Sequence, residues 1–220
     1  MSIYSAVNDN WTRVALMHSV ARDLYASTAN TDFRNRITGN GDAFPFDTNA
    51  YSTIENESRI VGMVMAWSVI TLESLVYHQL AEELDNMVLA TMAIEYPAQV
   101  TDKLNIGRSA RSELAKKLVI LSGHLQPAGP SLLTAIKVAD ALADKRNMIV
   151  HDKPYRYTDR GDGDIVIEGF RSRGDSESAT LRFDDLTSFY ADCDSVKRYV
   201  YEASSEPIDC DVDFTSLLCG

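Results

Sequence analysis

The chain has 220 residues, of which 45% are hydrophobic, and its formal net charge is −11. So much apolar material can fill a buried core, which argues against intrinsic disorder over most of the length. The acidity argues against a protein that coats nucleic acid nonspecifically, because that binding depends on basic surface. An enzyme that gathers positive charge locally remains compatible with this composition.

The cysteines give no sign of a metal site or a disulfide framework. Cys193, Cys210 and Cys219 lie near the C-terminus without a Cys-x-x-Cys spacing. An odd number of this kind indicates reduced thiols in a cytoplasmic protein. Structural zinc takes four ligands in paired spacing, and the chain has neither a P-loop nor a dinucleotide-binding glycine motif. We therefore expect no metal and no cofactor.

No membrane role is expected. Residues 1–14 carry polar and charged side chains where a signal peptide needs an apolar core. The most apolar stretch, residues 60–72, is about two-thirds of the roughly 20 residues that a membrane-spanning helix needs. It therefore predicts a buried core helix and, with the cysteines, a cytoplasmic location.

The first half of the chain is predicted to be helical. Residues 9–29 have helical apolar spacing, and glycines and a proline make residues 30–49 a loop. A long helical pattern covers residues 51–96 and fits two helices or one bent helix. Residues 108–122 form a further helix, ended by Gly123.

The second half is predicted to combine two helices with a small hairpin. A helix runs from Pro130 or Ser131, where proline is well tolerated, to about residue 152. Two strands follow, residues 164–170 and 179–183, joined by a Gly- and Ser-containing turn. Asp184 or Asp185 then caps a last helix that ends near residue 203.

These elements predict a mainly α fold, a helical bundle with a small β-hairpin (about residues 164–183) between the last two helices. Residues 1–205 are expected to form a single domain. Residues 206–220 are acidic and are expected to form a loose C-terminal tail.

Charge is distributed unevenly along the chain. Residues 60–101 contain five acidic residues and no lysine or arginine, whereas residues 103–117 contain five basic residues and one acidic residue. Residues 145–160 contain five basic and two acidic residues, and this segment includes His151. Ordinary solvated faces and a nucleic-acid surface explain such segments equally well on charge alone.

The segment around His151 could carry chemistry. In a helix, Asp144, Asn147 and His151 share one face, whereas Arg146 lies about 140° from His151. A histidine can exchange protons near neutrality, and an arginine offers a fork of donors to phosphate oxygens. Taken alone, such a pair near a helix end is more often a cap and a surface residue than a site. Its geometry suits a site assembled from two chains.

Arg146-Asn147-Met148-Ile149-Val150-His151 matches a pattern of HEPN domains, an arginine and a histidine separated by four to six residues. The polar residue after the arginine, commonly asparagine, is also present. An apolar helix leads into the motif, and residues 66–74 resemble the earlier helix of such domains. The resemblance covers about residues 56–151 in arrangement and is specific over the six-residue motif.

The resemblance implies a helical bundle that dimerises so that both copies of the motif line one cleft. Many HEPN proteins are metal-independent ribonucleases of toxin–antitoxin, phage-defence or RNA-processing systems, and others are non-catalytic. By position, Arg146 would bind phosphate, Asn147 would orient the scissile group and His151 would be the acid–base. Some members carry tyrosine two residues after the histidine, where this chain has Lys153.

Further residues are candidates for substrate contact. Glu73 could hold Arg146 or substrate, although a boundary position on its helix is the favoured interpretation. Unpaired RNA bases can stack on tyrosine side chains, and basic residues flank the motif. These candidates are Lys145, Lys153, Tyr155, Arg156 and Glu73.

The sequence leaves three alternative hypotheses for the function. The first is a homodimeric endoribonuclease that cleaves single-stranded or looped RNA without metal and is restrained by a cognate antitoxin. The second is a non-catalytic HEPN-like protein that binds nucleotide or RNA or serves as a scaffold. The third is an unrelated helical interaction protein in which Arg146 and His151 are structural.

Overall fold

The structure is a computed structural model of the whole chain. It describes the backbone of residues 3–27, 43–45, 48–83, 112–125, 130–151, 156–159, 164–168, 170–171, 178–179, 181–204 and 210–219. Side chains are described for residues 6–27, 52–80, 112–121, 131–151, 181–204 and 210–219.

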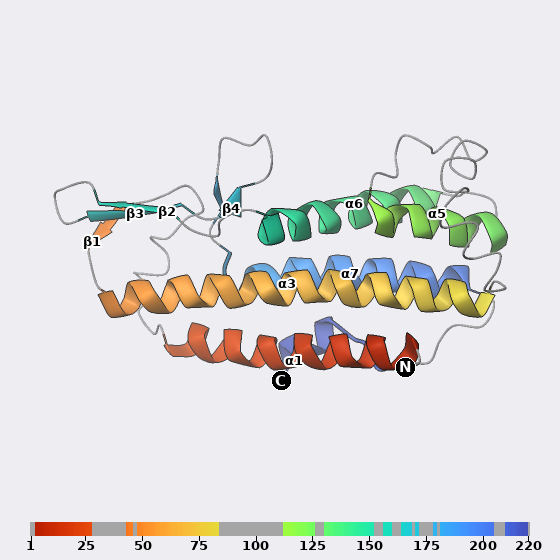
Figure 1. Cartoon of the computed structure of the whole chain (residues 1–220), viewed down its shortest axis with the longest axis horizontal. Helices are drawn as coiled ribbons and strands as arrows, with labels where there is room; N and C mark the ends of the chain where they lie inside the picture. Colours follow the sequence, from red (N-terminus) through yellow and green to blue (C-terminus); the bar gives the residue numbers. More distant parts are fainter. Residues whose placement is uncertain are drawn as a thin grey trace. The chain divides into compact units, whose positions relative to one another are not determined.

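The described part of the chain is mainly helical, as predicted (Figure 1). Its five α-helices are α1 (Ile3–Ser27), α3 (Thr48–Glu83), α5 (Glu113–Leu125), α6 (Pro130–His151) and α7 (Asp185–Ala203). A short 3-10 helix, η1 (Thr215–Cys219), lies near the C-terminus. Helix α1 begins earlier than predicted, and α5 continues through Gly123 rather than ending there.

Helix α3 is continuous over 36 residues, which settles the choice between one and two helices for its described part. Its stretch Ser52–Leu80 is long and apolar enough to cross a membrane. Most of that stretch is buried within the protein, and the buried residues include the polar side chains of Glu57, Ser58, Thr71 and Gln79. Burial inside the protein is typical of a core helix.

The chain falls into two compact units, which we describe separately. Unit 1 comprises residues 1–12, 68–144 and 189–220, and unit 2 comprises residues 13–67 and 145–188. The single domain expected over residues 1–205 stays a prediction.

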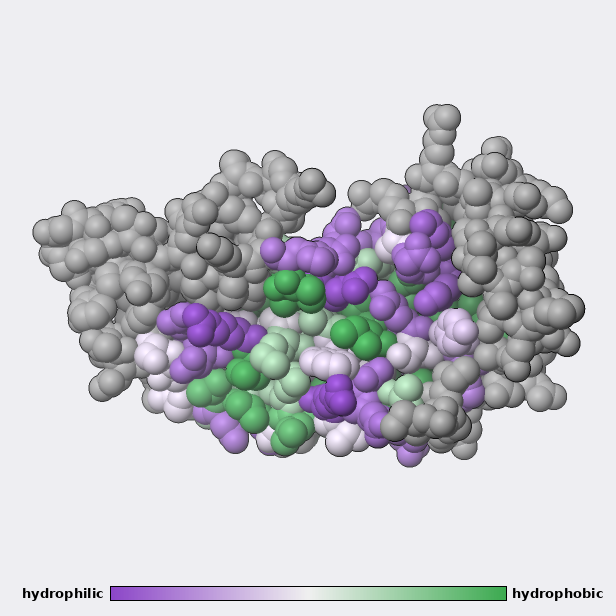
Figure 2. All heavy atoms as spheres, viewed as in Figure 1, coloured by the Kyte–Doolittle hydropathy of each residue, from purple (hydrophilic) through white to green (hydrophobic). Residues whose placement is uncertain are grey.

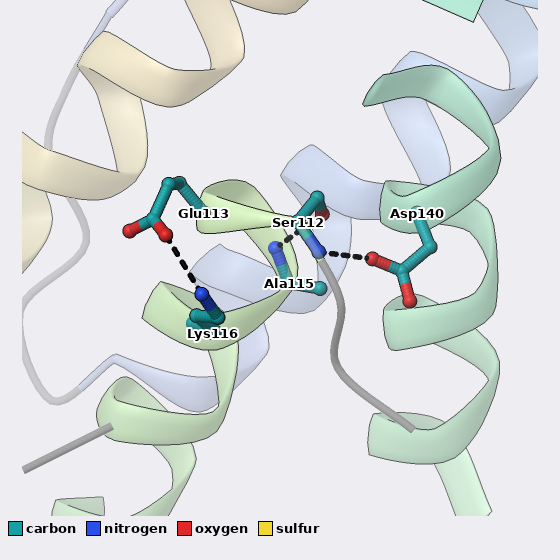
Figure 3. A network of polar contacts seen from close by, with 5 residues as sticks. All are labelled: Ser112, Glu113, Ala115, Lys116 and Asp140. Carbon is teal, nitrogen blue, oxygen red and sulfur yellow. Dashed lines mark hydrogen bonds and ion pairs between the residues drawn. The ribbon is translucent and has the colours of Figure 1, made fainter. Parts of the chain in front are cut away.

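In unit 1, a polar network fixes the start of α5 beside α6 (Figure 3). The hydroxyl of Ser112 caps α5 by accepting the N–H of Ala115 at 3.1 Å. The N–H of Ser112 itself donates to Asp140 Oδ1 of α6 at 2.7 Å. Asp140 is buried, so this bond satisfies a carboxylate that would otherwise be costly to bury. On the exposed side of α5, Lys116 pairs with Glu113 at 2.8 Å.

The predicted loose tail is instead packed where the structure describes it. Phe214 is fully buried and meets the ring of Trp11 edge-on, with centroids 5.2 Å apart. Asp194 of α7 accepts the backbone N–H groups of Phe214 at 3.2 Å and Thr215 at 2.9 Å. The expectation was wrong because two apolar residues within the acidic stretch, Val212 and Phe214, provide burial that its overall charge conceals.

In unit 2, the strands pair differently from the expected hairpin. Strand β3 (Asp164–Glu168) lies between β1 (Ala43–Pro45) and β2 (Arg156–Asp159), antiparallel to both. Strand β4 (Phe170–Arg171) pairs with β5 (Ser178–Ala179) in a separate two-stranded ladder. The partners of β3 therefore come from the expected 30–49 loop and from the segment after α6.

Residues 181–183, expected in a strand, have no strand structure. The N–H of Leu181 donates to Ser58 Oγ at 3.0 Å, and the N–H of Phe183 donates to Glu57 Oε1 at 3.1 Å. Side chains of α3 thus take the place of a neighbouring strand. Asp185, one of the two predicted caps, accepts the N–H of Arg182 at 2.8 Å and begins α7.

Candidate functional site

Helix α6 carries the candidate motif at its C-terminal end. Pro130 is the first helical residue, where its missing N–H costs no hydrogen bond. The first two-thirds of the helix bury an apolar face that ends at Ala143. None of residues 144–151 is buried. The motif therefore occupies the least covered part of this helix.

The motif residues differ in exposure. Asn147 and His151 are exposed, whereas Arg146 is half-buried and its Nε atom is buried. Because α6 remains helical from Arg146 to His151, their side chains leave the helix about 140° apart. The helical geometry expected from the sequence is thus present, and a single helix does not aim both groups at one point.

Apolar side chains lie between these polar residues. Met148 and Ile149 are half-buried, and Val150 is 56% exposed. At the other end of the helix, Leu133 of the first turn is exposed as well. The last turns of α6 thus present polar and apolar side chains that are exposed or half-buried.

The other candidate residues lie on different elements of the structure. Lys145 is half-buried beside Arg146 on the same helix. Glu73 is half-buried on α3 and belongs to unit 1, whereas Arg146 belongs to unit 2. Lys153 and Tyr155 lie outside the described residues. Arg156 begins β2, with its side chain outside the described set.

Comparison of the chain with protein-family models, with curated proteins and with solved structures finds no match. The resemblance to HEPN domains therefore rests on the residues of the chain itself.

Metal-binding side chains and thiols are further candidates for chemistry among the described residues. These residues contain no cluster of three or more His, Cys, Asp or Glu side chains that could hold a metal ion. All three cysteines are free, and Cys193 is fully buried. Burial, followed by the nearby Asp194 and Asp192, raises the pKa of the Cys193 thiol. A buried neutral thiol is a poor nucleophile, so Cys193 is a core residue.

One surface feature escaped the sequence analysis. Leu16 and Val20, which belong to the apolar pattern of residues 9–29, are 66% and 42% exposed. The buried positions of this part of the helix are Val14, His18 and Ala21. Leu16 and Val20 lie four residues apart, a spacing that places them on one side of the helix. Because the same spacing is typical of a core-facing side, the sequence alone does not show that this side is exposed.

Proposed function

We propose that this chain is a metal-independent endoribonuclease of HEPN type that acts in the cytoplasm. One observation carries the proposal. Arg146, Asn147 and His151 lie on the uncovered end of one continuous helix, where RNA can reach the amide and the imidazole. The partial burial of Arg146 restricts its side chain, which favours a fixed phosphate contact over a freely moving surface charge.

The reaction needs only groups of this motif. His151 takes the proton of the 2′-OH, and the 2′-oxygen attacks phosphorus while the bond to the 5′-oxygen breaks. The protonated His151 of that site then donates the proton to the leaving 5′-oxygen. Arg146 stabilises the negative charge that develops on the phosphoryl oxygens, and Asn147 orients the phosphate. The products are a 2′,3′-cyclic phosphate and a 5′-hydroxyl.

The active form in this proposal is a homodimer. The angle of about 140° between Arg146 and His151 favours a site built from two copies of the motif. The uncovered Val150, with the half-buried Met148 and Ile149 beside it, offers apolar surface for such a pairing.

The proposed substrate is single-stranded or looped RNA. In-line attack needs a flexible backbone, and splayed bases are open to aromatic stacking. Lys145, Lys153 and Arg156 would supply positive charge near the motif, and Tyr155 a stacking surface. Such an enzyme would act in toxin–antitoxin or phage-defence systems, where a cognate antitoxin protein would restrain it.

A second candidate is a non-catalytic HEPN-like protein that binds RNA or nucleotide, or acts as a scaffold. The net charge of −11 favours the scaffold role within this candidate, because an acidic surface opposes association with RNA. Following both cleavage and binding of one end-labelled single-stranded RNA separates the two candidates.

In that experiment, Asn147→Ala reduces cleavage with little effect on RNA binding if the protein is an enzyme. Lys137→Ala is the matched control, because Lys137 is an exposed residue of the same helix outside the motif. Binding without cleavage by the wild-type protein would favour the non-catalytic candidate. Neither binding nor cleavage of any RNA tested would contradict the enzyme and an RNA-binding role, and would favour the scaffold role.

A further inference from the structure

The solvent-facing side of α1 carries an ordered stripe of residues within unit 2. Arg13, Leu16, Val20, Asp23 and Ser27 are all exposed, and they follow one another at intervals of three and four residues. This spacing places them along one face of the helix, as in the contact face of a helix pair. The stripe is apolar at its centre and charged on both sides.

The apolar centre continues onto the neighbouring helix. Figure 2 shows hydrophobic side chains gathered over α1 and the part of α3 beside it. Met63 of α3 is 43% exposed, and the guanidinium of Arg13 lies 4.6 Å from the ring centre of Trp67 on α3. Exposed Leu, Val and Met side chains gathered on one face are typical of an interaction surface.

The order of charges along the stripe is complementary to that of a second copy of α1 in the antiparallel orientation. Arg13 and Asp23 lie five residues on either side of position 18, and Leu16 and Val20 lie two residues on either side. An antiparallel second copy, related by a two-fold axis at position 18, would set Arg13 against the partner's Asp23 at both ends. Leu16 would then meet the partner's Val20 twice. A parallel copy would instead set like charges against each other.

We propose that α1 mediates self-association of this chain through an antiparallel pair of α1 helices. The surface is self-complementary, as an isologous two-fold contact requires. One helix face forms a small interface, and protein interfaces below about 1,200 Å² in total are typically weak and transient. The association is therefore concentration-dependent, and it weakens with added salt because exposed ion pairs are screened.

This contact does not depend on the proposed ribonuclease activity, because it uses α1 and not the motif of α6. If two chains also pair through the motif, the α1 contact joins those dimers into a larger assembly. In either case, the mass of the particles rises with protein concentration.

Sedimentation velocity of the full chain over a wide range of concentrations tests the proposal. Arg13→Asp and Asp23→Arg should each weaken the association roughly tenfold, because two ion pairs become two repulsive pairs. The double variant Arg13→Asp/Asp23→Arg restores opposite charges at both ends and should recover the wild-type association. All substituted side chains are exposed, so circular dichroism should show an unchanged fold.

Leu16→Ser tests the apolar centre, and Leu133→Ser is its matched control, an exposed leucine on α6 in the other unit. Leu16→Ser should weaken the association and Leu133→Ser should not. A wild-type mass that is independent of concentration would overturn the proposal. Equal effects of the two leucine variants would also overturn it, as would a double charge variant that associates no more strongly than the single charge variants.

RNA cleavage at a fixed protein concentration should be retained in all of these variants, which separates this test from that of the enzyme.

Discussion

Glu57 and Phe183 lie 126 residues apart in the sequence, and the N–H of Phe183 donates to Glu57 Oε1 at 3.1 Å. The adjacent Ser58 accepts the N–H of Leu181 at 3.0 Å. Both acceptors are buried side chains of α3. This pair of bonds satisfies the backbone that leads into α7, and it explains why that segment needs no neighbouring strand.

Glu57→Ala should therefore destabilise the protein by about 1–3 kcal/mol, because it removes a buried acceptor from the Phe183 N–H. Asn56→Ala is the control, since Asn56 is the exposed neighbour on the same helix. It should change the free energy of unfolding by no more than about 0.5 kcal/mol. Urea denaturation measures both, and equal losses in the two variants would contradict this role of Glu57.

Phe214→Ala should lower the free energy of unfolding by about 3–5 kcal/mol, as expected for an aromatic side chain lost from a core. Phe214 contacts Trp11 and Tyr190, with ring centroids 5.2 and 6.0 Å apart. Leu217→Ala, at a half-buried position of the same segment, should cost less. A negligible effect of Phe214→Ala in chemical denaturation would mean that the C-terminal segment is not part of the folded core.

Stability should fall on the alkaline side. Burial raises the pKa of both the Cys193 thiol and the Tyr190 hydroxyl. Above about pH 8.5, the ordinary thiol value, the unfolded chain releases the Cys193 proton while the folded chain retains it, so stability decreases with pH. Cys193→Ala should flatten this dependence between that pH and the tyrosine range, as measured by thermal unfolding against pH. An unchanged slope would contradict the assignment.

The difference in burial between Cys193 and Cys219 predicts that their thiols react differently. In the folded protein at neutral pH, Cys219 is exposed and should react with iodoacetamide, whereas Cys193 should react only after unfolding. Mass spectrometry of the alkylated peptides distinguishes the two. Rapid modification of Cys193 under native conditions would show that it is accessible.

The sequence predicted the helices well because their apolar spacing and caps are local. Pro130 and Asp185 mark the observed starts of α6 and α7. Strand pairing was predicted poorly because it depends on residues distant in the chain. The partners of β3 come from residues 43–45 and 156–159, and neither segment has a strong alternating pattern.

At the candidate site, the sequence predicted the helix that holds Arg146 and His151 and the angle between them. It did not predict burial, because burial depends on which helices pack together. Within the apolar pattern of residues 9–29, for example, Leu16 and Val20 are exposed, whereas Val14 and His18 are buried. The resemblance to HEPN domains stays a prediction.

Mixing two inactive variants tests whether the site is built from two chains. Arg146→Ala and His151→Ala should each cleave at least roughly 100-fold more slowly when tested alone. In a mixed dimer, one site receives the intact Arg146 of one chain and the intact His151 of the other, so an equal mixture should recover roughly a quarter of the wild-type activity. No recovery, with mixed dimers demonstrated by differently tagged chains, would contradict a composite site.

The most direct test of the central claim is cleavage of single-stranded RNA in excess EDTA by the wild-type protein, His151→Ala and Lys137→Ala. A metal-independent enzyme that uses His151 as its acid–base should cleave with EDTA present and leave 2′,3′-cyclic phosphate ends. His151→Ala should be roughly 100- to 10,000-fold slower, and Lys137→Ala should match the wild type. Equal cleavage by the wild type and His151→Ala, or no cleavage by either, would contradict catalysis at this residue.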